Sequence, residues 1–183
     1  MTPTIRLARS EDAAAVAAFS ARTFFETYAD SNDPADMTAH LAAKYSEAIQ
    51  AAELADPCLV YLLAEIGSAL AGFALLHLDH SPESTTLSRP VELVRFYVAK
   101  EWHGHGVAQA LMSACRHEAI RRGGRTMWLA VWQSNTRAIA FYRKMGFAVA
   151  GTVAFRLGSQ VQTDHMMTLS LESVDSVEPV GRG

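Results

Sequence analysis

The sequence predicts an α/β domain with a mixed, mainly antiparallel central sheet of about seven strands, flanked by about four helices. Two observations support this prediction. Short runs of apolar, β-branched and aromatic residues, each suited to a strand, alternate with segments whose apolar residues recur at helical spacing. Two pairs of these runs are separated by Gly-Ser turns, which favour antiparallel hairpins. We expect one domain over residues 1–172 and a flexible C-terminal tail over residues 173–183.

Composition excludes several classes of function. The net charge of −3 over 183 residues gives no electrostatic basis for binding nucleic acid or an anionic membrane surface. No apolar run approaches the roughly 20 residues needed to cross a bilayer, and the N-terminus lacks the apolar segment of a signal peptide. We therefore expect a cytoplasmic protein. Cys58 and Cys115 fall in a predicted strand and a predicted helix, which favours two buried thiols over a disulfide.

The first part of the chain is expected to hold an edge strand and two helices. Ser10 is a suitable N-cap, with the acids Glu11 and Asp12 in the first helical turn. Asp33 followed by Pro34 marks a second helix start, because proline is favoured at the first helical position. The expected elements are a strand at Ile5–Leu7, a helix from Ser10 to Phe25 or Tyr28, and a helix from Asp33 to about Leu54.

A hairpin, a loop and a central strand are expected next. Two apolar strands, Cys58–Ile66 and Leu70–Leu78, are joined by Gly67-Ser68. The polar, Ser- and Thr-rich segment Asp79–Pro90 is predicted to be a loop. The run Val91–Val98 then reads as a buried central strand.

A glycine-containing loop links this strand to a predicted helix. The loop is Trp102-His103-Gly104-His105-Gly106, and apolar residues recur after it at helical spacing from Ala108 to Ala119. Gly104 and Gly106 can adopt positive φ, which lets a phosphate approach the backbone closely. A helix N-terminus also offers free N–H groups to an anion. A turn whose glycines serve geometry only is an equally good reading of the loop taken by itself.

The C-terminal part of the predicted domain supplies a strand, a helix and a second hairpin. Gly123-Gly124 is expected to end the preceding helix, and Asn135 to cap the next one, with Gly146 just past its end. The remaining expected elements are a central strand at Thr126–Trp132, and strands at Phe147–Leu157 and Val161–Leu171 around the turn Gly158-Ser159.

Two motifs and the order of the elements resemble the GNAT superfamily of acyl-CoA-dependent N-acetyltransferases. The loop His103-Gly104-His105-Gly106-Val107-Ala108 is similar to that family's Q/R-x-x-G-x-G/A motif. Asn135–Phe147 is similar to its N-x-x-A-x-x-F-Y-x-x-x-G-F signature. The element order extends the resemblance over nearly the whole chain. One departure is His103, where the family has Gln or Arg, so one side-chain contact to phosphate is weakened while the backbone contacts remain.

A narrower resemblance points to bacterial polyamine N-acetyltransferases of the PaiA type. It rests on five stretches of the chain: Thr23–Tyr28, Asn32, Asp36-Met37, Trp128–Trp132 and Gln162-Thr163-Asp164. This resemblance implies a polyamine or other small cationic amine as acceptor, with Phe24, Tyr28 and Glu92 as acceptor-binding residues. The acids Glu26, Asp30, Asp33 and Asp36 would suit a cationic acceptor, although helix N-termini are rich in acids in any case.

The superfamily resemblance implies that acetyl-CoA is the co-substrate and that a primary amine attacks its thioester directly in a ternary complex. It places the coenzyme diphosphate on the amides of Gly104–Ala108, makes His103 a further coenzyme-binding residue, and puts Asn135 close by. It also assigns polarisation of the thioester carbonyl to the backbone of Phe96, Tyr97 and Val98. A Rossmann interpretation of the loop is weaker, because Gln109 stands where a third glycine or alanine is expected.

Tyr142 and Glu92 are the candidate catalytic residues. A phenol with an ordinary pKa of about 10 can protonate a departing thiolate while staying un-ionised at neutral pH. Tyr142 also lies on the apolar face of its helix, where packing is the alternative role, but the match to the superfamily signature at this position favours catalysis. Glu92 is expected on the same strand face as Val94, Phe96 and Val98, where a carboxylate is costly unless it is paired or open to solvent. The resemblance makes it a candidate general base, as in some members of the superfamily, with a solvated strand-end acid or a partner for the neighbours of Arg95 as the alternative.

The sequence leaves other functions open. A metal site is not expected, because His103 and His105 have no further ligands at a familiar spacing. A catalytically silent acetyl-CoA-binding module and an acetyltransferase for protein N-termini or lysines are the alternative functions. Oligomeric state is not determined by the sequence, and a homodimer is one option. The expected partners are acetyl-CoA and a small amine.

Overall fold

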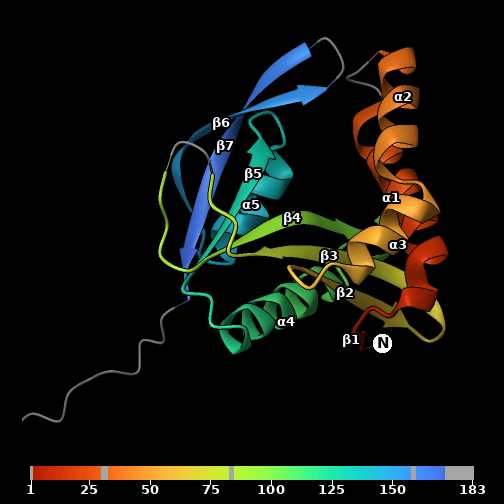
Figure 1. Ribbon diagram of the computed structural model, residues 1–183, viewed down its shortest axis with the longest axis horizontal. Helices are drawn as coiled ribbons and strands as arrows, with labels where there is room; N and C mark the ends of the chain where they lie inside the picture. Colours follow the sequence, from red (N-terminus) through yellow and green to blue (C-terminus); the bar gives the residue numbers. More distant parts are fainter. Residues whose placement is uncertain (1, 30–32, 83–84, 158–159, 172–183) are drawn as a thin grey trace, which may run out of the picture.

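All seven strands of the computed structural model belong to one sheet, which confirms the predicted α/β class (Figure 1). The structure describes residues 2–29, 33–82, 85–157 and 160–171. The strands are β1 (Thr4–Leu7), β2 (Leu59–Ile66), β3 (Ala69–Leu78), β4 (Pro90–Val98), β5 (Thr126–Trp132), β6 (Ala148–Leu157) and β7 (Gln160–Ser170). Their order across the sheet is β1-β2-β3-β4-β5-β7-β6. The expected turn Gly158-Ser159 and the expected tail at 173–183 lie outside the described residues.

Five α-helices lie within the described ranges. They are α1 (Ala13–Tyr28), α2 (Pro34–Lys44), α3 (Glu47–Ala55), α4 (Val107–Arg121) and α5 (Thr136–Lys144), with short 3-10 turns η1 (Ser10–Asp12) and η3 (Lys100–Trp102). No helix in these ranges is long and apolar enough to cross a membrane.

The sheet is antiparallel except where β4 meets β5. Parallel pairing joins Pro90–Glu92 to Thr126–Trp128 and extends no further along either strand. Beyond these residues the two strands fan apart, as Figure 1 shows. The sheet therefore opens at its centre, and β5 offers no ladder partner to the second half of β4.

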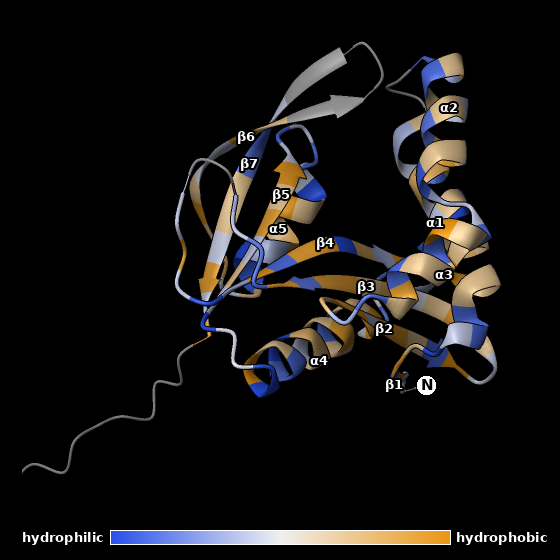
Figure 2. Cartoon of the chain, viewed as in Figure 1, coloured by the Kyte–Doolittle hydropathy of each residue, from blue (hydrophilic) through white to orange (hydrophobic). Residues whose placement is uncertain are grey.

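Helices cover both faces of the sheet. On one face α4 and α5 bury the larger apolar cluster, which includes Leu111, Met112 and Ile139. On the other face Val16 and Phe19 of α1 pack against residues of β2 and β3 such as Leu63 and Phe73. The central strands are accordingly hydrophobic along much of their length (Figure 2). Burial of both faces explains why the sequence of β5 is apolar at consecutive positions.

A β-bulge interrupts the register of β4. Leu76 of β3 pairs with Leu93, and the next residue of β3, Leu75, pairs with Arg95, so Val94 is an extra residue without a partner on β3. An inserted residue of this kind bends the strand and increases its local twist. The bulge lies just beyond the point where β4 leaves β5.

The bulge changes which side chains share a face of β4. Leu93, Phe96 and Val98 all pack with the α4 cluster, although strict alternation would place Leu93 opposite the other two. Glu92 precedes the bulge and points to the other face, with Tyr97. The expectation that Glu92 shares a face with Phe96 and Val98 is therefore wrong, because alternation was assumed to continue through Val94.

Two helix predictions were wrong in detail. The helix expected from Asp33 to Leu54 is divided into α2 and α3, and the Ser46 side chain caps α3 by accepting a hydrogen bond from the Ile49 N–H at 3.3 Å. The helix expected to begin at Ser10 begins at Ala13, after the turn η1. The predicted cap at Asp33 is confirmed, since its side chain accepts from the N–H groups of Ala35 and Asp36.

The two cysteines differ in environment. Cys115 is fully buried in α4, as expected, whereas Cys58 is exposed and precedes β2. The N–H of Cys58 donates to the Asp56 carboxylate at 2.8 Å, so this residue belongs to the turn that leads into the strand. Both thiols are free.

Candidate active site

A cavity of about 420 Å³ occupies the opening between β4 and β5. Residues of α1, β4, the loop before α4, β5 and α5 line it. The predicted site residues in its lining are Tyr28, Phe96, Tyr97, Val98, His103, Ala108, Asn135 and Tyr142. The structure thus brings together residues that are more than 100 positions apart in the sequence.

Other predicted residues lie outside the lining. They are Phe24, Glu92, Gly104, His105, Gly106 and Val107. The three loop residues Gly104, His105 and Gly106 are exposed beside the cavity residues His103 and Ala108. Phe24 is buried beneath the cavity wall, where its ring stacks on His40 with 4.7 Å between centroids.

The loop before α4 has the form of an anion cradle. Gly104 and Gly106 adopt φ of +82° and +81°, and a Cβ built at either position would meet no atom within 4 Å. Gly106 is the N-cap residue of α4 and provides no side-chain cap, so the first N–H groups of the helix have no intrahelical acceptor. The positive end of the helix dipole adds to the attraction. This open backbone fits the diphosphate of a coenzyme.

The side chain of His103 contacts the end of strand β4. Its Nε2 lies 2.8 Å from the carbonyl oxygen of Val98, at the end of β4. His105 is exposed, with Nδ1 3.0 Å from the carbonyl oxygen of His103. The His103 ring therefore positions the start of the loop relative to β4, a role that its place in the sequence motif does not suggest.

Positive charge collects in the cavity lining. Lys100 and Arg137 are both exposed residues of the lining, from η3 and from the first turn of α5. Neither was among the residues predicted from the sequence, since lone surface cations carry no recognisable pattern. Their charges suit the phosphate groups of a coenzyme that the α4 N-terminus would hold.

Tyr142 lies at the bottom of the cavity with 9% of its surface exposed. Its ring makes edge-on contacts with Phe96, Phe141 and Phe147 at centroid distances of 6.3, 5.5 and 5.8 Å. Burial raises the pKa of Tyr142 above its ordinary value. The phenol is therefore protonated at neutral pH and available as a proton donor, while its ring also serves the packing role that the sequence allowed.

The second half of β4 presents backbone to the cavity. Residues Leu93–Val98 all contribute to the lining. Because β5 pairs with β4 only as far as Glu92, N–H and C=O groups on this edge of β4 have no ladder partner on β5. Val94 at the bulge is 39% exposed. Such an edge can accept hydrogen bonds from an extended ligand or donate to its carbonyl groups.

Arg95 also reaches the cavity, but it is already paired. Its guanidinium donates to both carboxylate oxygens of Glu53, at 2.7 and 2.9 Å, and to the Tyr61 hydroxyl at 2.7 Å. The pair is largely buried, with side chains 11% and 20% exposed. It ties α3 to β4 just beyond the bulge, so Arg95 supports this wall of the cavity.

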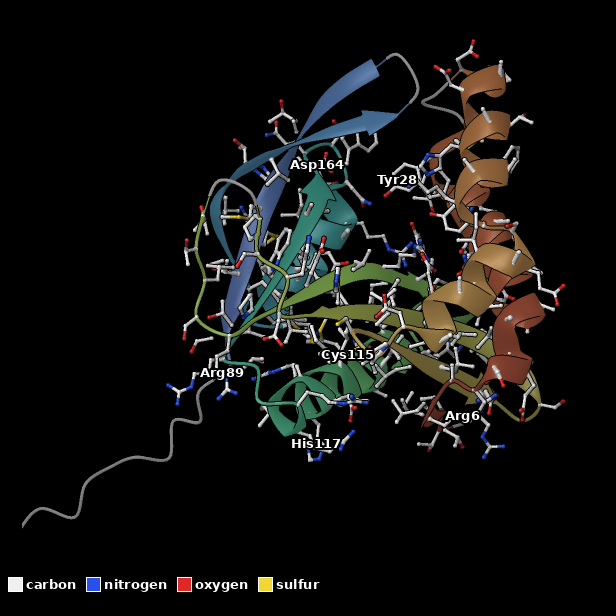
Figure 3. The ribbon with its side chains drawn as sticks, viewed as in Figure 1. Arg6, Tyr28, Arg89, Cys115, His117 and Asp164 are labelled. Atoms are coloured by element: carbon white, nitrogen blue, oxygen red, sulfur yellow. The ribbon has the colours of Figure 1, made fainter. Side chains whose placement is uncertain are left out.

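Tyr28 and Asn135 join α1 to α5 across the cavity. A hydrogen bond joins the Asn135 side chain to the Tyr28 hydroxyl and acts to lower the pKa of that phenol. The Asn135 side-chain oxygen accepts the Ala138 N–H at 3.1 Å as the cap of α5. Burial, with a smaller contribution from the nearby carboxylate of Asp164, raises the pKa of Tyr28 to about 12. Figure 3 shows Tyr28 on the α1 side and Asp164 on β7.

Of the acids proposed for a cationic acceptor, three lie in the part of the chain that the structure describes, and one of these three lies at the cavity. Glu26, an exposed residue of α1, belongs to the lining. Asp33 instead caps α2, and Asp36 lies in the first turn of that helix, where acids suit the dipole. Asp30 is outside the described residues.

Glu92 is directed away from the cavity. Its Oε2 lies 2.7 Å from Nδ1 of His80, in the loop after β3, and its side chain is 16% exposed. Desolvation raises the pKa of the Glu92 carboxyl above its ordinary value. A role for Glu92 as general base stays a prediction, and its contacts in the structure are with the histidine.

Comparison with known proteins adds to this geometry. The model of the acetyltransferase (GNAT) family matches residues 16–147. An uncharacterized N-acetyltransferase of Mycobacterium tuberculosis is 35% identical over 160 residues, which cover 87% of this chain and 98% of that protein. A probable spermine N(1)-acetyltransferase of Bacillus subtilis is 28% identical over 87 residues, or 47% of this chain and 57% of that protein.

The fold is also that of solved acetyltransferases. The crystal structure of the PaiA N-acetyltransferase from Thermoplasma acidophilum, determined in complex with coenzyme A, superimposes with a TM-score of 0.76 and 23% identity. The superposition covers 93% of this chain and 99% of that one. At this identity the likeness concerns the fold.

Proposed function

The chain belongs to the GNAT family of acetyltransferases and is an acetyl-CoA-dependent N-acetyltransferase, and on this premise we propose that its acceptor is a small cationic amine of the polyamine class. The observation that carries the proposal is the presence of the Glu26 carboxylate and the Tyr142 hydroxyl in the lining of one cavity. The first can attract an ammonium group, and the second can donate a proton. The partial match to a probable spermine acetyltransferase supports the same acceptor class.

The residues around the α4 N-terminus are assigned to coenzyme binding. The backbone amides that follow Gly106 would hold the diphosphate, and the side chains of Lys100 and Arg137 would contribute charge. The free edge of β4 at Phe96–Val98 would accompany the extended arm of the coenzyme toward the bulge. Bound in this way, acetyl-CoA supplies a thioester whose carbonyl carbon is open to an amine.

The remaining chemistry is assigned to the cavity residues. Backbone N–H groups on the β4 edge would donate to the thioester oxygen as negative charge develops on it. The amine nitrogen forms the new C–N bond while the C–S bond breaks, and the Tyr142 hydroxyl gives its proton to the departing sulfur. The proton lost by the amine passes to water, and the Tyr142 phenolate regains a proton from water. Holding both reactants in one cavity supplies the orientation that a direct transfer requires.

Acceptor selection is assigned to the α1 side of the cavity. Glu26 is exposed and would act on a cationic amine through Coulomb attraction across solvent, whereas Tyr28 gives the wall an aromatic surface. An acceptor carrying a second positive charge would gain from Glu26 while its neutral amine reaches the thioester. This arrangement favours diamines and polyamines over monoamines.

The test is a measurement of thiol release from acetyl-CoA with a panel of acceptors. Spermine, spermidine and putrescine are compared with an alkyl monoamine of similar length, which lacks a second ammonium group. The panel also contains a lysine-free peptide with a free N-terminus and an N-terminally acetylated peptide with one free lysine. We expect the highest kcat/KM with a polyamine. Higher kcat/KM with either peptide would overturn the acceptor assignment and favour a protein acetyltransferase.

A further inference from the structure

Three metal-ligating side chains meet outside the cavity, where β3 ends and β4 begins. His77 of β3 lies directly opposite Glu92 of β4 in the antiparallel register. His80 follows the strand, after Asp79, which adopts a left-handed φ of 54°. This backbone conformation, which aspartate tolerates better than most residues, turns the chain so that His80 returns over the sheet.

The cluster is compact. The three residues are His77, His80 and Glu92. Each offers one possible metal-binding atom, and these three atoms all lie within 4.8 Å of one another. The rings of His77 and His80 stack with 4.3 Å between centroids and 8° between planes. The Nε1–H of Trp128 on β5 donates to the carbonyl oxygen of His80 at 2.7 Å and anchors this part of the loop.

The function assigned to the protein does not use this cluster. None of its three residues belongs to the cavity lining. Glu92 is largely buried, and a carboxylate in that position is costly unless a cation or several donors compensate it. The His80 imidazole compensates part of this cost, because its Nδ1 lies 2.7 Å from Oε2 of Glu92.

We propose that His77, His80 and Glu92 form a binding site for a divalent transition-metal ion, with Zn²⁺ as the favoured occupant. Two imidazole nitrogens and one carboxylate oxygen are a ligand set typical of zinc sites with an open fourth position. Imidazole-rich sets favour Zn²⁺, Co²⁺ or Ni²⁺, whereas Mg²⁺ and Ca²⁺ prefer oxygen ligands. Water would complete the coordination.

Binding requires a small rearrangement. Lone pairs of two parallel, stacked imidazoles cannot converge on one ion, so the His80 ring must rotate out of the stack with His77. The His80 side chain is 46% exposed and lies in a loop, which leaves it free to rotate. Glu92 would then exchange its contact with His80 for the ion. The bound ion would fasten this loop to β4 at the point where β4 and β5 begin to diverge.

Metal binding by the full-length protein tests the proposal directly. After dialysis against a chelator and removal of that chelator, the protein is titrated with Co²⁺ by absorption spectroscopy and with Zn²⁺ by calorimetry. We expect one equivalent to bind, with the d–d bands of a low-coordinate Co²⁺ site and a melting temperature that rises with Zn²⁺ concentration. Absence of saturable binding to the wild-type protein would overturn the proposal.

Variants assign the ligands. His80→Ala, His77→Gln and Glu92→Gln are each expected to weaken the metal affinity by more than the roughly 10- to 100-fold that loss of an outer-shell partner causes. The controls are His105→Ala at the exposed loop and His117→Ala on α4 (Figure 3), which should bind like the wild type. If affinity falls in a control and persists in the three ligand variants, the site lies elsewhere. Because no readout depends on acetyl transfer, failure here leaves the acceptor assignment intact.

Discussion

The ring of Tyr142 meets the ring of Phe96 edge-on, with 6.3 Å between centroids and 66° between planes. Two further phenylalanines contact the same ring, so packing fixes its position and the hydroxyl group is not needed for it. This separation of roles makes Tyr142→Phe an informative change. We expect it to retain the fold and the affinity for acetyl-CoA but to lower kcat by about 10²- to 10⁴-fold, the range of a general acid–base step.

The pH profile of the wild-type enzyme offers a second check on Tyr142. Because burial raises the pKa of this phenol, it should stay protonated through pH 10 and should produce no alkaline loss of activity below that value. The measurement is kcat between pH 6 and 10, under conditions where chemistry is rate-limiting. An unchanged kcat in Tyr142→Phe would mean that Tyr142 serves packing alone and is not the proton donor.

Gly106→Asp should abolish acetyl-CoA binding. Gly106 has a φ of +81° at the N-cap of α4, where a carboxylate would introduce negative charge beside the N–H groups assigned to the diphosphate. The substitution also adds backbone strain of about 1 to 2 kcal/mol. Affinity is measured by calorimetry with acetyl-CoA.

Gly67→Asp is the matched control for this strain. Gly67 has a φ of +62° in the β2–β3 turn, and like Gly106 it has no atom within 4 Å of a built Cβ. Both variants should lose similar stability in thermal unfolding, and only Gly106→Asp should lose the coenzyme. Retained affinity in a folded Gly106→Asp protein contradicts the assignment of the loop.

Local patterns in the sequence were sufficient to predict most of the helices and strands. Strand β5 has the predicted bounds Thr126–Trp132, and Asn135 caps α5 as predicted. These features depend on hydrogen bonding and burial among residues that are close together in the chain, so they can be recognised in the sequence itself. The break between α2 and α3 was missed because the apolar stripe continues through Tyr45 while Ser46 starts a new helix.

The bulge at Val94 could not be predicted, and it alters the site. A strand's alternation can be read only if its register is continuous, and the register of β4 depends on its pairing with β3. For this reason Glu92 was expected beside Phe96 but lies on the other face. The contact between His103 and the Val98 carbonyl was missed for a similar reason, because it depends on how the loop folds back over the strand.

Glu26→Gln should raise KM for polyamines and leave kcat unchanged. The carboxylate is exposed at the cavity, so its attraction for an ammonium group is of the order of 1 kcal/mol or less, which corresponds to an increase in KM of about two- to fivefold. The effect should diminish at high ionic strength, and KM for a monoamine, which carries no second ammonium group, should not change. Asp36→Asn removes a half-buried acid that lies outside the lining, and it is the control. Equal changes in both variants would contradict a specific role for Glu26.

The Arg6–Asp12 pair should make stability depend on pH in the acidic range. The guanidinium of Arg6 donates to both oxygens of Asp12, at 2.7 and 2.8 Å, and also contacts Glu65 of β2. These hydrogen bonds hold the pKa of Asp12 below its ordinary value of 3.8. A group whose pKa is lower in the folded state stabilises the fold above its unfolded pKa, and this contribution is lost as the pH falls through the folded pKa.

Asp12→Asn should therefore lower the free energy of unfolding by about 1 kcal/mol at pH 7, and the difference from wild type should shrink as the pH falls below about 4. Urea unfolding from pH 7 down to the lowest pH at which both proteins fold measures this difference. Glu11→Gln is the control, because the Glu11–Arg9 pair is 3.5 Å long and its side chains are 71% and 73% exposed, so no measurable change is expected. A constant difference between Asp12→Asn and wild type at every pH would mean that Asp12 acts through its shape and its hydrogen bond to the Arg9 N–H, and not through its charge.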